Sequence, residues 1–458
     1  MSRGLVRELL RLGWPVLIAQ LAVMANSVID TIMAGRYGTL DLAAVGIGAS
    51  IYFSVFVALM GVLLALTPIV AHMYGAGRYA DIGEELRQSA WLAAALALIS
   101  LALFYYPEPF LAVARLTPAL EAKVRAYLHA LAWAVPASLL FRVFYSFSTA
   151  ISRPRTVMAL TLVGLALKVP LNWVFMYGNL GAPELGSTGC AVATALISWI
   201  LCALAWTWCW FEPGYRRYGV FARWSWPNAQ ALGRILSLGL PIGLTFLIDV
   251  TGFTFMALFI ARLGALYSAA HQIAANLAAL CFMLPLALGN AASVVVGQSL
   301  GAHRHARARE AGLIGLALAL GCAAALGACL YGFAGAIAGL YTGDEELRRV
   351  AAGLIAFVAV YHLFDAVQAV AVNVLRGYKR AVVPMLIYAV ALWGVGLGGG
   401  YVLGLTHADL AWLGLSASGL SPPMGAPGFW LAAIASLALA ASLVTAYFLR
   451  VSRAAATA

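Results

Sequence analysis

The feature that most constrains this chain is a series of long apolar runs. A membrane-spanning helix needs about 20 predominantly apolar residues, and runs of that kind recur along the whole 458-residue sequence. We place twelve of them at residues 12–35, 46–71, 88–107, 126–150, 156–178, 188–211, 235–261, 265–298, 311–334, 350–375, 381–406 and 426–449. The sequence therefore predicts an all-α integral membrane protein with twelve transmembrane helices.

Composition and charge support a membrane setting and exclude nucleic-acid binding. Charged residues make up 10% of the chain, against about 25% in an ordinary soluble domain. The net charge is +11, but the basic residues lie in short loops between apolar runs instead of forming one basic face. Such loop charges set membrane topology.

The distribution of Lys and Arg predicts the orientation of the chain. With a cytoplasmic N-terminus, nineteen basic residues fall in inner loops and seven in outer loops. Because an excess of Lys and Arg marks the cytoplasmic side, both termini are expected in the cytoplasm. The N-terminal segment shows no cleavage pattern and is interpreted as a retained helix.

The sequence contains an internal repeat at a shift of 226 residues. At this shift Gly13-Trp14-Pro15 aligns with Gly239-Leu240-Pro241, and Arg36 aligns with Arg262. The shift spans six helices, so both halves start on the same side of the membrane, an arrangement found in secondary transporters. We expect an N-terminal lobe at 1–211, a cytoplasmic linker at 212–234 and a C-terminal lobe at 235–458.

Three acidic residues lie inside apolar runs: Asp30, Asp249 and Asp365. Placing an aspartate at a helix centre costs about 2.5–3.5 kcal/mol on insertion scales, and such residues usually mark ion or proton pathways. The structural alternative is a hydrogen-bonded carboxyl group that joins helices. The acids do not align with one another across the repeat, so we expect each lobe to have its own set.

Polar neighbours refine the candidate sites. Tyr361 is four residues before Asp365 and shares its helix face, so its hydroxyl group is a candidate partner of the acid or of the same ion. His362, three residues before Asp365, is a weak candidate, because a lone helical histidine is more often a packing residue.

Another polar group lies in the fifth apolar run. Asn172 is a candidate with an alternative role as an interhelical hydrogen bond, and Lys168 lies one helical turn before it. Arg142 is a weak candidate, since its side chain is close enough to a helix end to extend toward the interface.

No catalytic or nucleotide-binding pattern is present. None of the three lysines follows a glycine as a P-loop requires, and there is no zinc-protease helix or nucleophile elbow. The six cysteines lie in or next to apolar runs and are interpreted as packing residues. We therefore expect no enzyme activity and no cofactor, and transport energy that comes from an ion gradient or a partner protein.

Several stretches, in order, resemble the multidrug and toxic compound extrusion (MATE) family, in its bacterial NorM-like branch. They are Val28–Gly35, Pro170–Phe175, Gly181–Gly186, Ala270–Gln272, Asp365–Gln368, Leu375–Lys379 and Gly428–Leu431. Together they extend over essentially the whole chain.

The resemblance implies two six-helix lobes in a V-shaped fold and export of cationic amphipathic drugs in exchange for Na⁺ or H⁺. It implies a multi-pass protein of the bacterial inner membrane. The family's cation ligands carry over onto Asp249, Tyr361 and Asp365 in the C-terminal lobe, where Na⁺ is the candidate metal. In the N-terminal lobe they carry over onto Asp30 and Asn172.

The chain departs from the family pattern at two positions. Asp249 stands where the family usually has Glu, which shortens the reach of the carboxyl group. Lys168 stands where the family often has Asn, so we hypothesise that its ammonium group takes the place of a cation beside Asp30. Coupling would then run mainly through Asp249 and Asp365.

The sequence is less consistent with three other functions than with an antiporter. A flippase of lipid-linked precursors would favour a strongly basic cavity, whereas three acids face two bases, Arg142 and Lys168, within the helices. A membrane enzyme lacks a catalytic constellation, and a channel is disfavoured by the repeat and the intramembrane acids. The expected partners are organic cations and the lipid bilayer, with no ATPase partner, and two complete lobes make a monomer sufficient.

Overall fold

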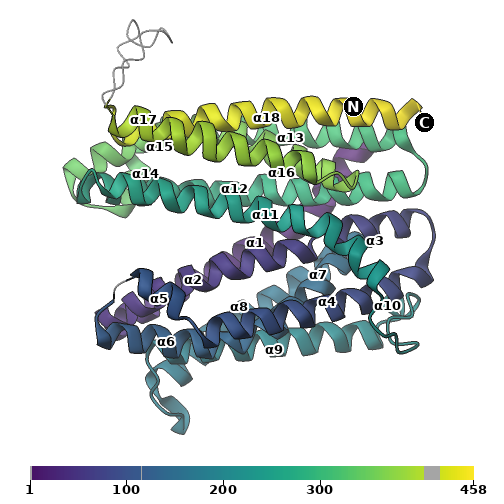
Figure 1. The fold of residues 1–458 in the computed structure, drawn as a ribbon, viewed down its shortest axis with the longest axis horizontal. Helices are drawn as coiled ribbons and strands as arrows, with labels where there is room; N and C mark the ends of the chain where they lie inside the picture. Colours follow the sequence, from purple (N-terminus) through teal and green to yellow (C-terminus); the bar gives the residue numbers. More distant parts are fainter. Residues whose placement is uncertain (1–2, 115, 407–422, 458) are drawn as a thin grey trace, which may run out of the picture. The chain divides into compact units, whose positions relative to one another are not determined.

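The computed structural model describes residues 3–114, 116–406 and 423–457, and in this part of the chain every regular element is helical (Figure 1). Eleven helices are long and apolar enough to cross a membrane, or twelve if one bent pair counts as a single span. This confirms the all-helical fold class. In chain order the elements are α1 (Arg3–Tyr37), α2 (Thr39–Leu63), α3 (Leu66–Gly75), α4 (Tyr79–Tyr105), α5 (Glu108–Ala114), α6 (Pro118–Ala132), α7 (Ala134–Ala150), α8 (Pro154–Tyr177), η1 (Asn179–Gly181), α9 (Ser187–Phe211), α10 (Pro213–Arg216), α11 (Ala229–Ala261), α12 (Ala265–Gly301), α13 (His305–Gly332), α14 (Ala334–Tyr341), α15 (Glu345–Gly377), α16 (Val382–Tyr388), η2 (Ala389–Gly398), α17 (Gly399–Leu405) and α18 (Ala426–Thr457).

The bent pair corresponds to the predicted run 126–150. Here α6 and α7 meet at Trp133 with an angle of 41°. Pro136 lies in the first turn of α7. A proline inside a helix has no N–H to donate to the carbonyl group four residues earlier, and its ring clashes with that group. That carbonyl belongs to Ala132, the last residue of α6, which explains the position of the bend.

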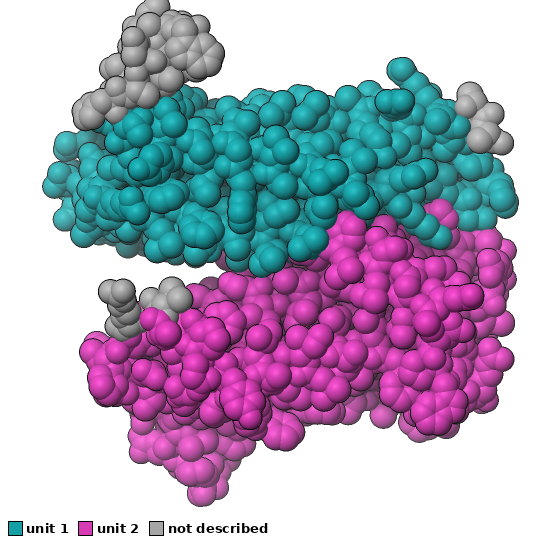
Figure 2. Space-filling view, in the orientation of Figure 1, with its two compact units in different colours: residues 1–13, 244–458 teal, residues 14–243 magenta. Residues whose placement is uncertain are grey.

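The chain forms two compact units, shown in different colours in Figure 2. Unit 1 contains residues 1–13 and 244–458, and unit 2 contains residues 14–243. The chain therefore changes units inside α1 and inside α11, next to Pro15 and Pro241. The compact units are thus divided after residues 13 and 243. The lobe boundaries expected from the sequence (1–211, 212–234 and 235–458) stay a prediction.

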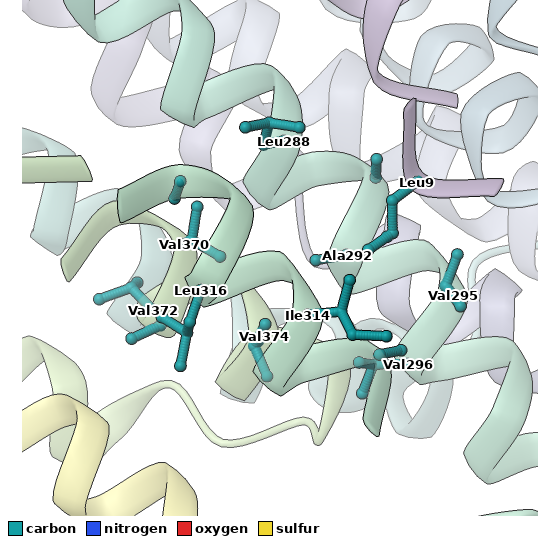
Figure 3. Close-up of a cluster of buried hydrophobic side chains, with 14 of the residues drawn as sticks. Leu9, Leu288, Ala292, Val295, Val296, Ile314, Leu316, Val370, Val372 and Val374 are labelled. Atoms are coloured by element: carbon teal, nitrogen blue, oxygen red, sulfur yellow. The ribbon is translucent and has the colours of Figure 1, made fainter. Parts of the chain in front are cut away.

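The core of unit 1 is built around α15, which contacts α12, α13, α14 and α18. Figure 3 shows part of its hydrophobic cluster, in which Val370 and Val374 of α15 lie with Ala292 of α12 and Ile314 of α13. The first turns of α1 belong to the same cluster, where Leu9 is 1% exposed. The helix that carries Asp365 is thus the most enclosed element of its unit.

In unit 2 the corresponding central helix is α9, which packs on α6, α7 and α8. Its contact with α8 is close because Gly189 has no side chain. A Cβ atom at that position would lie 2.2 Å from the carbonyl oxygen of Phe175. Small residues permit such close approach of membrane helices.

The predicted linker, residues 212–234, is folded against unit 2. It contains α10 and a series of turns, and its last residues form the start of α11. Arg87 of α4 donates hydrogen bonds to the carbonyl oxygens of Gly219 and Val220 at 2.8 and 2.9 Å. At the other end of the segment, Arg153 donates to both carboxylate oxygens of Glu212, and these hydrogen bonds raise the pKa of Arg153.

Substitution of Gly189 tests the packing of unit 2. We expect Gly189→Ala to destabilise the protein by about 1–3 kcal/mol, because the added methyl group overpacks the contact of α8 with α9. The measurement is the temperature at which the purified protein loses its folded peak in size-exclusion chromatography. Gly46→Ala is the matched control, since its Cβ atom would meet no atom within 4 Å; an equal loss in both variants would contradict the packing argument.

Candidate functional site

The polar side chains of unit 2 are placed by α8. This helix begins with Pro154, which is favourable at the first helical position. It ends at Gly178, whose φ of 71° is the left-handed conformation that suits glycine. Lys168 and Asn172 are separated by one turn, so they lie on the same face. Both are buried in the middle of an apolar helix.

Asp30 of α1 is the common partner of these two residues. Its Oδ1 atom lies 2.8 Å from the Lys168 ammonium nitrogen and accepts a hydrogen bond of 2.8 Å from the Asn172 amide nitrogen. Lys168 also donates to the hydroxyl oxygen of Thr194 on α9 at 2.6 Å. The side chains of Lys168 and Asp30 are only 2% and 13% exposed. We call these four residues the Asp30 cluster.

The Asp30 cluster is a neutralised ion pair. A carboxylate and an ammonium group in contact cancel each other's charge, and the hydrogen bonds to both partners reduce the cost of burial. The contact expected from the sequence, a lysine beside Asp30, is present in the structure. One polar atom of the cluster has no partner in the described part of the chain, the side-chain oxygen of the buried Asn172.

The acids of unit 1 lie on two helices, α15 and α11. The N-terminus of α15 is fixed by Asp344, whose carboxylate accepts a hydrogen bond of 2.8 Å from the backbone N–H of Leu347. This is the usual N-cap interaction. Asp365 lies in the buried central part of α15 and is 5% exposed.

Asp365 is hydrogen-bonded through its own helix to α16. The Gln368 side-chain nitrogen donates to Asp365 Oδ1 at 3.1 Å. The Tyr388 hydroxyl group in turn donates to the side-chain oxygen of Gln368. All three side chains are buried. No basic residue in the described part of the chain forms an ion pair with Asp365.

Asp249 of α11 is half-buried and borders a cavity. The cavity is also lined by Asn373 and Arg376 of α15 and by Tyr388 of α16. The Arg376 guanidinium group is turned toward Asn373, to which it donates at 3.2 Å, and its Cζ atom lies 5.1 Å from the centre of the Phe246 ring. Within the described residues, no ion pair or hydrogen bond involves Asp249.

Tyr361 and His362, the other residues predicted beside Asp365, make different contacts. The Tyr361 ring packs edge-to-face on Phe253 and Trp430 and lines a second cavity, next to Gly252 and Gly396. His362 is 1% exposed, and neither of its ring nitrogens has a hydrogen-bond partner in the described residues. His362 therefore makes no side-chain hydrogen bond to Asp365 in the structure.

Arg142, the remaining weak candidate, lies in unit 2 on α7. Its guanidinium carbon is 4.3 Å from the centre of the Tyr145 ring. This is the geometry of a cation–π contact within one helix turn. The contact gives Arg142 a packing role apart from the Asp30 cluster.

The two units thus present different chemistry. Asp30, the acid predicted within the membrane in unit 2, is paired with a lysine, whereas Asp249 and Asp365 of unit 1 have oxygen-bearing neighbours, Gln368, Tyr388 and Asn373. Hard cations such as Na⁺ take oxygen ligands from carboxylates, amides and hydroxyl groups. The residues around Asp249 and Asp365 fit a small cation or a proton. No cluster of His, Cys, Asp and Glu in the described chain fits a transition metal.

The sequence did not predict five residues of these sites: Thr194, Gln368, Asn373, Tyr388 and Arg376. Arg376 is one of the nineteen basic residues expected in inner loops, but the structure places it in the last turn of α15 with 7% exposure. Gln368 could have been found, because it is three residues after Asp365 and shares its face. Tyr388 had no such signal, since it meets Gln368 from another helix.

Comparison with known proteins agrees with this arrangement. The MatE family profile matches residues 15–174 and 241–402, which together make up more than half of the chain. The chain belongs to the MatE family. The first residues of the two matched segments, 15 and 241, differ by the same 226 residues as the internal repeat, which confirms the duplication predicted from the sequence. It is a membrane transporter of the MATE type, and the resemblance to the NorM-like branch is confirmed by its relatives.

Among these relatives is the "Probable multidrug resistance protein NorM" of Aromatoleum aromaticum, 42% identical over 96% of this chain and 92% of that protein. The multidrug resistance protein PmpM of Pseudomonas aeruginosa is 37% identical over 99% of this chain and 94% of its own. Among solved structures, the Vibrio cholerae MATE transporter VcmN has a TM-score of 0.82, with 20% identity and coverage of 99% and 98%. A multidrug resistance MATE family transporter described as outward-facing has a TM-score of 0.88 at 17% identity, with coverage of 99% and 97%. These structural likenesses show the fold.

Breaking the ion pair of the Asp30 cluster tests its structural role. We expect Lys168→Met to destabilise the protein by about 3–5 kcal/mol, because an unpaired buried carboxylate remains. The double variant Asp30→Asn/Lys168→Met is expected to recover most of that loss. Thermal unfolding of the purified variants measures both, and a double variant no more stable than the single one would contradict the pairing.

Proposed function

We propose that this protein is a secondary antiporter that exports cationic amphipathic drugs and dyes in exchange for Na⁺ or H⁺. The coupling ion is cargo, and no other cofactor is required. The observation that carries the proposal is the contrast between the acids: Asp30 is paired with Lys168, whereas Asp249 and Asp365 have no basic ion-pair partner in the described residues. A carboxylate without a counter-ion inside a membrane gains most from binding a cation or a proton.

Names and topology support the cellular setting that we propose. Relatives with 33–42% identity are named multidrug resistance proteins NorM or PmpM, all from bacteria. The excess of basic residues in alternate loops favours an inner-membrane protein with both termini in the cytoplasm. Each of the two matched halves lies in the same chain, so a monomer is sufficient for transport.

In the proposed mechanism Asp249 and Asp365 bind the coupling ion in one conformation and release it in the other. A transported ion must have different affinities for the two states, because a ligand shifts an equilibrium only through that difference. Cationic cargo and coupling ion are alternative partners for negative charge, which makes their exchange obligatory. Lys168 removes Asp30 from this competition, so the Asp30 cluster keeps its charge balance throughout the cycle.

The test is transport of a fluorescent organic cation into proteoliposomes, with an imposed Na⁺ gradient and, separately, an imposed pH gradient. We expect one of the gradients to drive transport, and Asp365→Asn and Asp249→Asn each to reduce that transport at least about tenfold, because a neutral amide cannot bind a cation by charge. Asp81→Asn is the control, since Asp81 is exposed and pairs only with Arg78 on the same helix turn.

Two results would count against the proposal. Transport that neither gradient drives would argue against antiport, and uptake of lipid-linked cargo by the same vesicles would then favour a flippase. Transport that both aspartate variants retain would remove these residues from coupling.

The role of Lys168 has a separate test in the same vesicles. We expect Lys168→Asn to preserve the dependence on the coupling ion, because Asp249 and Asp365 remain intact, while the new amide leaves Asp30 open to a cation. Binding of the ion, measured by isothermal titration calorimetry, should then show a site that the original protein lacks. Loss of ion-driven transport in Lys168→Asn at normal thermal stability would place coupling in the Asp30 cluster instead.

A further inference from the structure

The span at Val382–Leu405 has an unusual backbone. It begins as α16, continues as the ten-residue π-helix η2 (Ala389–Gly398), and returns to an α-helix in α17. π-Helical segments are rare, usually a single turn long, and frequently occur at functional sites. This one follows directly after Tyr388, the residue that is hydrogen-bonded to Gln368.

The sequence makes this segment easy to rearrange. Gly394, Gly396, Gly398, Gly399 and Gly400 lie within its second half and the following turn. Glycine weakens the preference for an α-helix because the unfolded or rearranged backbone has more freedom. The five glycines therefore lower the free-energy cost of changing the backbone geometry of this segment.

Both acids of unit 1 are tied to this segment. At its N-terminal end, Tyr388 reaches Asp365 through the side chain of Gln368. In its middle, the Trp393 indole nitrogen donates a hydrogen bond of 3.3 Å to the backbone oxygen of Ile248, the residue before Asp249. The Trp393 ring also packs edge-to-face on Phe255 of α11. One helical segment thus holds the side chain of one acid and the backbone of the other.

Two cavities lie next to this span. Tyr388 lines the cavity that contains Asp249. Leu392, Gly396 and Leu397 line the second cavity, together with Tyr361. The segment itself therefore borders the second cavity, and Tyr388, directly before it, borders the cavity of Asp249.

We propose that Tyr388 and Trp393 are positioning residues for ion exchange. They hold the segment Ala389–Gly398 to both acids, so that binding or release of the coupling ion at either acid changes the helical geometry of this segment. The inference rests on the proposed function, because it takes Asp249 and Asp365 as the groups that bind the ion. Neither Tyr388 nor Trp393 needs to touch the ion, and each acts through the residue that it holds.

Hydrogen–deuterium exchange tests the proposal without requiring transport. The probe is the coupling ion alone, supplied as Na⁺ or as protons, with peptides that cover 389–398 followed by mass spectrometry. We expect exchange in these peptides to differ between the ion-loaded and ion-free protein, and the double variant Asp249→Asn/Asp365→Asn to hold it at one level under both conditions. Tyr388→Phe, Gln368→Leu and Trp393→Phe should each reduce this ion response.

Transport supplies a second reading that separates positioning from stability. We expect Tyr388→Phe to lower the maximal ion-driven rate about fivefold, the effect of one lost hydrogen bond, with a smaller change in the half-saturating ion concentration. Tyr401→Phe is the matched control, because it removes a hydroxyl group from the same span whose ring only packs on Phe259. Variants are compared at equal amounts of folded protein, which removes the effect of simple destabilisation.

The outcomes are distinguishable from those of the proposed function. If exchange in 389–398 is the same with and without Na⁺ or protons, and is unchanged in Asp249→Asn/Asp365→Asn, the inference is wrong, even if the protein proves to be an antiporter. It is also wrong if all three positioning variants respond to the ion as the unaltered protein does. If no gradient drives transport but the segment responds to an ion through Asp365 and Tyr388, the linkage stands and the antiport proposal fails.

Discussion

A carboxylate in the hydrocarbon region must find a positive partner, a proton or a polar cavity, and the described chain uses this constraint differently in its two units. Asp30 is satisfied internally by Lys168 and Asn172, with Thr194 holding the lysine in place. Asp365 has only the neutral amide of Gln368, and Asp249 borders a cavity. Of the three acids predicted within the membrane, one is therefore held in an ion pair, and the charge of the other two can be balanced by a bound cation or proton. The two halves repeat the same helices, but they carry ionisable residues at different helix positions, and this difference determines which unit has acids without a basic partner.

Much of the fold follows from hydrophobic length. Each of the twelve predicted runs corresponds to a candidate membrane span or to the bent pair, because an apolar segment in a bilayer must satisfy its backbone internally. The bend at Trp133 was also encoded, in Pro136, although it was not predicted. The partition of α1 and α11 between units could not be predicted, since it depends on which neighbours their first turns contact and not on their own pattern. Leu9, for example, has the same apolar pattern as its neighbours in sequence, and only its contacts with α12 and α13 place it in unit 1.

The sites were predictable where one helix carries the signal. Lys168 and Asn172 are one turn apart, so their shared helix face follows from that spacing, whereas their position beside Asp30 was expected only from the family resemblance. Contacts between helices carried no such signal: Tyr388 reaches Gln368 from a span twenty residues away in sequence. Arg376 was misplaced for a related reason, because hydropathy assigns an arginine at a helix end to the loop even when the folded helix encloses it. The π-helix was not predictable either. The glycines of this segment indicate a weak preference for the α-helix, but they do not specify which backbone hydrogen bonds form.

The assignment of residues 1–13 to unit 1 has a consequence for how the protein is made. This segment leaves the ribosome first, yet Leu5 and Leu9 are buried against helices that are synthesised after residue 265. At roughly 5–20 residues per second, they wait on the order of 10 to 50 seconds for those neighbours. During that interval residues 14–243 can complete their own unit, whereas Leu5 and Leu9 lack the neighbours that bury them in the folded protein. Burial of residues 1–13 is therefore a contact between segments nearly 300 residues apart, to which the ion pair of Glu8 with Arg307 also belongs.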